Sequence, residues 1–306
     1  MTILDLGQIE GSILLFGGPY SNLQATQSIR EIAEKRAIPP QNVICNGDVV
    51  AYCGDPEETV QAIRNWGIHT VMGNCEESVG EQQDDCGCGF EENTVCSLLS
   101  VEWYNYVTAT VSNDSRSWMR QLPRKIQFES HGIRFAVIHG GVENMSEFVF
   151  QSSSMEKKHQ DALSIDTDCV IGGHCGIPFG QKIADRYWIN TGVIGMPAND
   201  GSQNGWYVVL ESVADGKGIK ASWHRLNFDN AAAAKSMKEG KLGAAYHDAL
   251  LSGLWPSMDV LPEPEKNLQG KRLQLQPLTL TQPLKQFLSP DNSHKGVNSL
   301  SQDALA

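Results

Sequence analysis

The stretch VICNGDVV, residues 43–50, shows the pattern on which the fold of this chain is built. A short β-branched and apolar run ends in a glycine-containing turn, and that turn carries a polar side chain, Asp48. The same pattern returns in TVMGN (70–74), FAVIHGG (135–141) and CVIGGH (169–174), with Asn74, His139 and His174 as the polar residues. Because α/β proteins place polar side chains at the carboxyl edge of a sheet in this way, we expect these side chains to meet there.

The four strand-end residues are predicted metal ligands. A carboxylate, an amide oxygen and two imidazoles suit a borderline divalent cation. Each residue by itself also has an ordinary interpretation, as a turn residue or as a core histidine. The agreement between four strand ends favours a metal site formed by Asp48, Asn74, His139 and His174.

The apolar runs alternate with helical patterns in the first part of the chain. Strands are expected at 13–16, at 42–45 and up to Met72, with helices after GGPYSN (17–22) and in DPEETVQAIRNW (55–66). Ser21, followed by Gln24 three residues later, predicts a helix N-cap. This alternation favours a parallel sheet, whereas GWYVVLES and GIKASWHRL predict an antiparallel hairpin.

The composition limits the partners and the location. The 306 residues are 41% hydrophobic and carry a net charge of −12, so we expect no general nucleic-acid binding. No apolar run approaches the roughly 20 residues that span a bilayer, and the first residues lack a basic signal region, so we expect no membrane association and a cytoplasmic protein. In a reducing compartment the eight cysteines are expected to be thiols.

The chain divides by composition into a large domain and shorter flanking segments. Residues 1–12 are predicted to be an N-terminal extension and residues 13–229 the main domain, with residues 78–132 inserted over the site. Residues 230–261 are predicted to form a helical appendage, through which the chain is able to dock on its own core or to form an oligomer. Residues 262–306 lack a core-forming pattern and are predicted to be largely disordered.

The ordered series of strand-end motifs resembles the calcineurin-like metallophosphoesterases over roughly residues 13–225. The signature of that family runs D-x-H, G-D, G-N-H, H-G and G-H-x-H. The resemblance implies an α/β fold, a two-sheet αββα sandwich, with metal bound at the strand ends. It assigns one metal to Asp48, Asn74, His139 and His174, all of which are present.

The other half of the signature is replaced. The second metal would share Asp48 and add the D-x-H pair and the last histidine, but these positions hold Gly18, Tyr20 and Gly176. The position of the G-N-H histidine holds Cys75. A thiol ordinarily titrates near 8.5, whereas the imidazole that it replaces titrates near 6.5. We expect at least one divalent metal ion per chain, zinc, manganese or iron, and weak or unusual phosphatase chemistry.

Further residues near these motifs are candidates for the site. Cys75 and Tyr20 are the candidate catalytic residues, and Tyr20 is alternatively a phenolate ligand. Asn22 in GGPYSN is a candidate for substrate binding, because the backbone of this turn has the form that cradles an anion; the alternative is an ordinary strand-to-helix turn. Thiolates select softer metals, and the possible additional ligands are Cys175, Cys86 and Cys88.

These features support three hypotheses about function. The first is a divergent metal-dependent phosphoesterase that hydrolyses a small phosphate mono- or diester with a metal-activated water. The second is a metal enzyme of another class, with iron or a soft metal held partly by Cys75 or Cys175. The third is a non-catalytic metal-binding sensor or partner platform. The intact set of four ligands favours the first.

Overall fold

Strand β2 (Ile13–Phe16) lies between two layers of apolar side chains, and its alternation organises the core. Ile13 and Leu15 face the space between two β-sheets, whereas Leu14 and Phe16 face helices. The Phe16 ring stacks on Trp66 of a covering helix, with 6.0 Å between the ring centroids. A strand buried on both faces is therefore continuously apolar, as the sequence shows.

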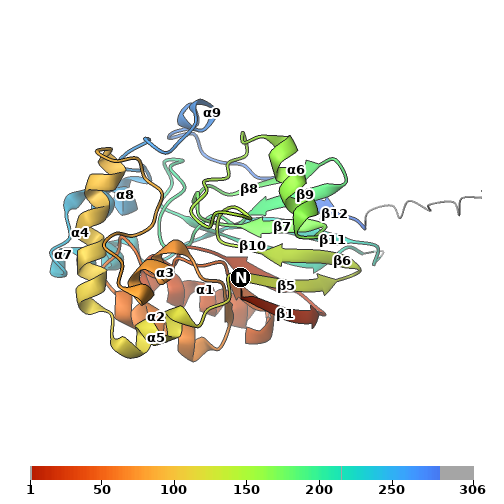
Figure 1. Cartoon of the computed structure of the whole chain (residues 1–306), viewed down its shortest axis with the longest axis horizontal. Coiled ribbons are helices and arrows are strands. Elements are labelled where there is room, and N and C mark those ends of the chain that lie inside the picture. Colours follow the sequence, from red (N-terminus) through yellow and green to blue (C-terminus); the bar gives the residue numbers. More distant parts are fainter. Residues whose placement is uncertain (1, 215, 283–306) are drawn as a thin grey trace, which may run out of the picture.

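The computed structural model describes residues 2–214 and 216–282, and in these residues two six-stranded sheets pack face to face (Figure 1). The first sheet has the strand order β12 (Leu278–Leu280), β11 (Ile219–Leu226), β10 (Gly205–Ser212), β2, β3 (Val43–Cys45) and β4 (His69–Thr70). The second sheet has the order β1 (Ile3–Gln8), β5 (Lys125–Ser130), β6 (Ile133–Val137), β7 (Cys169–Gly172), β9 (Arg186–Asn190) and β8 (Phe179–Ile183).

Strand directions follow the expectations from the sequence. Strands β2, β3 and β4 are parallel, and β10 and β11 form the predicted antiparallel hairpin. In the second sheet β6, β7 and β9 are parallel. The carboxyl ends of β3 and β4 lie at the same end of the sandwich as those of β6 and β7, because Asp48, which follows β3, lies within 3.2 Å of His139, which follows β6.

Helices cover the outer faces of the two sheets. The helices are α1 (Leu23–Lys35), α2 (Pro56–Trp66), α3 (Asn74–Glu81), α4 (Val95–Thr110), α5 (Asn113–Arg120), α6 (Met155–Ser164), α7 (Asn230–Glu239), α8 (Ala244–Ser252) and the short α9 (Glu263–Lys266). Helices α1 and α2 pack on the first sheet, and α6 packs on the second. Figure 1 shows α4, α7 and α8 at one end of the molecule, away from α6. The mixed α/β sandwich that the resemblance implied is confirmed.

Three segments differ from the sequence-based expectations. Residues 3–8 form the edge strand β1, which pairs with β5, so much of the expected N-terminal extension is part of a sheet. The expected insertion, 78–132, contains β5 and therefore contributes to that sheet. In the expected disordered tail, β12 pairs with β11, while residues 283–306 lie outside the described residues. These pairings join segments far apart in the sequence, which local patterns do not reveal.

The expected helical appendage packs on the core of its own chain. The Tyr246 ring on α8 lies 4.5 Å from the Tyr52 ring, measured between centroids. The Ser236 hydroxyl on α7 donates to the carboxylate of Asp55, just before α2. The appendage therefore covers the first sheet's helical layer. Among the described helices, none is both long enough and apolar enough to cross a membrane.

Candidate metal centre

The four strand-end residues meet at the common end of the two sheets. Asp48 follows β3, Asn74 begins α3 after β4, His139 follows β6 and His174 follows β7. All four side chains are buried, with between 1% and 7% of each residue exposed. Each sheet thus supplies two of the residues, and the packing of the sheets brings them together.

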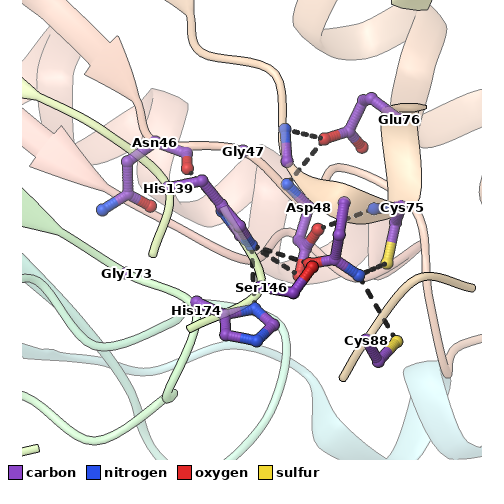
Figure 2. A network of polar contacts seen from close by, with 12 residues as sticks. Asn46, Gly47, Asp48, Cys75, Glu76, Cys88, His139, Ser146, Gly173 and His174 are labelled. Carbon is purple, nitrogen blue, oxygen red and sulfur yellow. Dashed lines mark hydrogen bonds and ion pairs between the residues drawn. The ribbon is translucent and has the colours of Figure 1, made fainter. Parts of the chain in front are cut away.

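The side-chain atoms of these residues converge on one atom, His139 Nε2 (Figure 2). Asn74 Oδ1 lies 3.0 Å from it, His174 Nδ1 lies 3.0 Å from it and Asp48 Oδ2 lies 3.2 Å from it. The candidate ligand atoms of Asp48, His139 and His174 all lie within 4.8 Å of one another. This spacing is the one that the ligands of a single bound cation require.

Hydrogen bonding sets the tautomer of His139. Its Nδ1 atom lies 2.8 Å from the backbone carbonyl of Asn46, which only accepts, so Nδ1 carries the proton. In the neutral ring, Nε2 then presents its lone pair to the acceptor atoms of Asp48 and Asn74. Lone pairs that face one another in a buried site repel unless a proton or a cation lies between them. The donor set therefore fits a metal ion, with a carbonyl behind the histidine as in many metal sites.

The electrostatics of the cluster favour a single positive charge at its centre. Burial opposes protonation of His139, but Asp48 outweighs this effect and raises the pKa of His139 above its usual value. Burial and the neighbouring His139 lower the pKa of His174 to about 3. Burial disfavours the Asp48 carboxylate, but the two histidines outweigh it and lower its pKa. Both directions at Asp48 and His139 show that positive charge is favoured beside the Asp48 carboxylate, which suits a bound cation.

Glycines allow the two loops of the first sheet to approach the site. Gly47 has φ +101°, and a Cβ there would lie 2.8 Å from the backbone nitrogen of Gly73. A Cβ at Gly73 would lie 2.6 Å from the backbone nitrogen of Asp48. Both contacts are closer than real Cβ atoms make. The glycines before Asp48 and Asn74 are therefore needed for the two loops to touch.

Glu76, which the sequence analysis did not select, supports the ligand loops from behind. It is fully buried on α3, and its carboxylate accepts the backbone N–H groups of Gly73 at 2.9 Å, Asp48 at 2.8 Å and Val49 at 2.7 Å. Burial, followed by repulsion from Asp48, raises the pKa of Glu76 to about 7. The sequence signal was only half of a capping box: Glu76 stands three residues after Gly73, whose backbone N–H it accepts, but glycine has no side chain to complete the box.

Cys86 and Cys88, which were possible additional metal ligands, are bonded to each other. They form a disulfide with each other, which corrects the expectation that both are thiols. Asn74 Nδ2 donates to the Cys86 carbonyl at 2.9 Å. The same atom lies 3.4 Å from Cys88 Sγ, a contact drawn as a dashed line in Figure 2. This loop therefore holds the Asn74 amide so that its oxygen, rather than its nitrogen, faces His139.

Cys75 lies in the first turn of α3 beside the candidate ligands. Its backbone N–H donates to Asp48 Oδ1 at 3.2 Å, and its Sγ lies 3.5 Å from Asn74 Nδ2 (Figure 2). The side chain is buried, and burial, then Asp48 and Glu76, raise the pKa of its thiol well above the usual value. Cys75 is therefore a neutral thiol at the edge of the cluster.

Tyr20 and Cys175 also lie near the cluster. Tyr20 has φ +53°, and its ring meets that of Tyr52 edge-on with 4.7 Å between centroids. Burial, then Asp48, raise the pKa of the Tyr20 phenol well above its usual value, so it is not a phenolate without a metal. Cys175 Sγ accepts from Asn190 Nδ2 at 3.2 Å and packs in the apolar cluster beneath α6. Cys175 does not join the described Asp48–His139–His174 group.

The structure corrects two expectations for the GGPYSN turn. The N-cap of α1 is Asn22 rather than Ser21, because Asn22 Oδ1 accepts the backbone N–H of Ala25 at 2.9 Å. Asn22 Nδ2 donates to the Gly195 carbonyl at 2.9 Å. Both polar ends of this buried side chain are thus bonded within the protein, so Asn22 secures the turn and does not offer a substrate-binding group.

The fold and the site define a class of protein. Residues 21–215, more than half of the chain, match the family model described as the calcineurin-like phosphoesterase superfamily domain. The chain belongs to the calcineurin-like phosphoesterase superfamily.

Three similar proteins match over most of the chain. An uncharacterised protein of Methanocaldococcus jannaschii is 24% identical over 239 residues, which cover 72% of this chain and 89% of that protein. A metallophosphoesterase from Sphaerobacter thermophilus superposes with a TM-score of 0.60 at 19% identity, over 80% of this chain and 100% of that chain. A hypothetical protein of Pyrococcus horikoshii superposes with a TM-score of 0.67 at 13% identity, over 80% and 99% of the two chains. The two structures show the common fold.

Proposed function

We propose that the chain is a metal-dependent phosphoesterase that holds one divalent cation with Asp48, Asn74, His139 and His174. The observation that carries this proposal is the convergence of Asp48 Oδ2, Asn74 Oδ1 and His174 Nδ1 on His139 Nε2, within 3.2 Å. Four donor groups from four strand ends, buried together with a carboxylate among them, support a cation site. Membership of the phosphoesterase superfamily supports the reaction class.

In this proposal, residues of the chain bind the cation and hold its ligands in position. Asp48 supplies a carboxylate and His139 supplies the lone pair of its Nε2 atom to bind the cation, and the Asn46 carbonyl fixes the His139 ring. Glu76 holds the Asp48 loop, and the Cys86 carbonyl turns the Asn74 amide. When bound, a divalent cation polarises the phosphoryl oxygen and lowers the pKa of a water molecule, so that hydrolysis proceeds near neutral pH.

The replacement of the G-N-H histidine by Cys75 limits the range of substrates. A buried neutral thiol protonates a leaving group less readily than an imidazolium does. We therefore expect esters with good leaving groups, such as 4-nitrophenyl esters, to be hydrolysed faster than alkyl esters.

Metal content is the first test. Protein purified without added metal is analysed by plasma mass spectrometry and by its absorption spectrum. We expect about one zinc or manganese ion per chain and no visible band. Stoichiometric iron or copper with a charge-transfer band would favour the second hypothesis, in which Tyr20, Cys75 or Cys175 contributes to a redox-active site.

Turnover is the second test. With added manganese or zinc, bis(4-nitrophenyl) phosphate is expected to release 4-nitrophenolate, and His139→Ala or His174→Ala to lower kcat/KM by more than about 100-fold. His159→Ala is the matched control, because His159 on α6 pairs with Asp185, which precedes β9, and is not a member of the cluster. Metal-dependent stability without hydrolysis of any ester would instead support a non-catalytic binder.

A further inference from the structure

An apolar pocket opens directly beside the candidate metal centre. It has a volume of about 70 Å³, and His174 lies on its wall. Six aromatic side chains from distant parts of the chain line it: Tyr20, Tyr52, Phe90, Phe148, Tyr246 and Trp255. The Tyr52 ring contacts those of Tyr20 and Tyr246, and the Phe90 ring stacks on that of Phe148. Phe148 links these rings to the site, since its ring lies 4.3 Å from the His174 ring between centroids.

The pocket occupies the place of the replaced half of the signature. Tyr20 and Gly176, which stand where further ligands were expected, both line it. A Cβ at Gly18 would lie 2.5 Å from Val193 Cγ1 and 2.7 Å from Tyr20 Cζ, so an aspartate does not fit there. Gly176 has φ +72°, and a Cβ on it would lie 3.2 Å from the Trp255 ring. Apolar side chains therefore surround the positions at which the resemblance implied further metal ligands.

The helical appendage supplies much of the far wall. Tyr246 lies on α8, and Trp255 follows this helix. The Tyr246 ring lies 4.5 Å from that of Tyr52, and the Trp255 Nε1 donates to the Pro197 carbonyl at 2.7 Å. The hydrogen bond fixes the indole, so the wall is preformed rather than created by a ligand. Preformed sites of this kind bind with a smaller loss of conformational entropy.

The chemistry of the lining selects an uncharged, flat group. Among residues 2–214 and 216–282, no lysine, arginine, aspartate or glutamate lines the pocket, whose accessible surface is mainly apolar. A charged group would lose its hydration there without a compensating partner. Aromatic walls instead favour a ring that stacks or packs edge-on against them. The absence of a lining cation also favours the single negative charge of a phosphodiester over the double charge of a monoester.

We propose that this pocket binds an aromatic ester group of a phosphodiester whose phosphorus lies at the Asp48–His139–His174 cluster. The proposal rests on the proposed function for the position of the phosphorus. His174 belongs to both the cluster and the pocket wall, so a group bonded to that phosphorus through one oxygen reaches the rings directly.

The experiment compares two unreactive analogues of equal charge with the manganese-loaded protein. The monomethyl ester of benzylphosphonate carries a ring on a CH₂ group in place of the ester oxygen, and the monomethyl ester of ethylphosphonate lacks the ring. Calorimetric titration is expected to give binding at least about tenfold tighter for the benzyl compound. Equal affinity of the two compounds would overturn the proposal.

Three variants locate the effect. Tyr246→Ala and Trp255→Ala are expected to weaken the binding of the benzyl compound more than that of the ethyl compound, and so to remove the benzyl preference. Ser257→Trp, on a half-buried lining residue, fills the pocket without removing a wall and is expected to do the same. Trp118→Ala is the control, because Trp118 packs on the core but does not line the pocket. A preference that persists in all three pocket variants would overturn the proposal.

The two proposals fail separately. Metal-dependent hydrolysis of bis(4-nitrophenyl) phosphate without a benzyl preference would overturn the aromatic pocket and leave the phosphoesterase. A benzyl preference without hydrolysis of any ester would support the pocket and overturn the phosphoesterase. Failure of both compounds to bind would overturn the pocket, and loss of turnover in the same preparation would overturn the phosphoesterase too.

Discussion

The Glu76 carboxylate accepts the backbone N–H of Asp48 at 2.8 Å, so a residue of helix α3 holds the loop that follows strand β3. The same carboxylate also accepts from Val49 and from Gly73, which precedes Asn74. The two candidate ligands of the first sheet are thereby joined through one buried side chain. Their separation depends on this side chain rather than on either strand alone.

Replacing Glu76 is expected to weaken metal binding. Glu76→Gln turns one acceptor oxygen into an NH₂ group that faces backbone donors, so the Asp48 loop is expected to shift and metal affinity to fall by about 10- to 100-fold. Zinc titration calorimetry measures this fall. Glu77→Gln is the matched control, because the half-buried Glu77 pairs with Arg124 and makes none of these bonds. Equal affinities in the two variants would contradict the role of Glu76.

Metal removal is expected to lower the stability of the fold. A ligand that binds only the folded chain at 100 times its Kd adds about 2.7 kcal/mol to the free energy of unfolding. Chelation should therefore lower the Tm of the wild type and of His159→Ala, and leave the Tm of His174→Ala nearly unchanged, as differential scanning calorimetry would show. An equal response of all three proteins to chelator would place the metal elsewhere.

Restoring the last histidine of the signature is not expected to restore a second metal. Gly176→His places a side chain at φ +72°, at a cost of about 1–2 kcal/mol, and presses it against Trp255, at a further cost of about 1–3 kcal/mol. Gly67→His is the control, because Gly67 has φ +75° with open space around it. Denaturant unfolding should show a larger loss for Gly176→His, and metal analysis an unchanged stoichiometry. A second bound metal in this variant would refute the expectation.

Asp200 is expected to give the fold a pH-dependent stability. Burial opposes its ionisation, but hydrogen bonds from Ser202, the Leu273 backbone and Arg225 outweigh burial and lower the pKa of Asp200. Because the folded-state pKa lies below the unfolded value of about 3.9, the contribution is present above that pH and is lost as the pH falls through the folded-state pKa.

The test of Asp200 compares unfolding at several pH values. Asp200→Asn is expected to lower the free energy of unfolding by about 1–3 kcal/mol at pH 7, and the difference from wild type should shrink as the pH falls below about 4. Asp84→Asn, on an exposed loop residue, provides the baseline. A destabilisation by Asp200→Asn that does not change with pH would show that the amide fails for steric reasons alone.

Local sequence was sufficient to find the main strands and the candidate ligands. Asp48, Asn74, His139 and His174 each follow a short apolar run and a glycine, and such strand ends in a parallel sheet meet at one edge. These features depend on a few adjacent residues, so a single sequence carries them.

Other features required contacts between distant segments. The edge strands β1 and β12 are short, and apart from Leu280 their residues are exposed or only partly buried. Their local sequence therefore does not mark them as strands, and their pairing with β5 and β11 appears only in the folded chain. The three backbone bonds to Glu76 and the turning of the Asn74 amide by Cys86 likewise join residues of separate loops.

The sequence by itself determined which residues stand at the strand ends and which half of the metallophosphoesterase signature is lost, because both are local patterns. Only the tertiary structure decided what replaced the lost half. Tyr246 and Trp255 come from the C-terminal appendage and line the same pocket as Tyr20 and Gly176. Tyr246 is more than two hundred residues from Tyr20 in the sequence, and Trp255 is about eighty residues from Gly176. The wall that they form depends on burial of the appendage against the core, which no short stretch of the chain specifies.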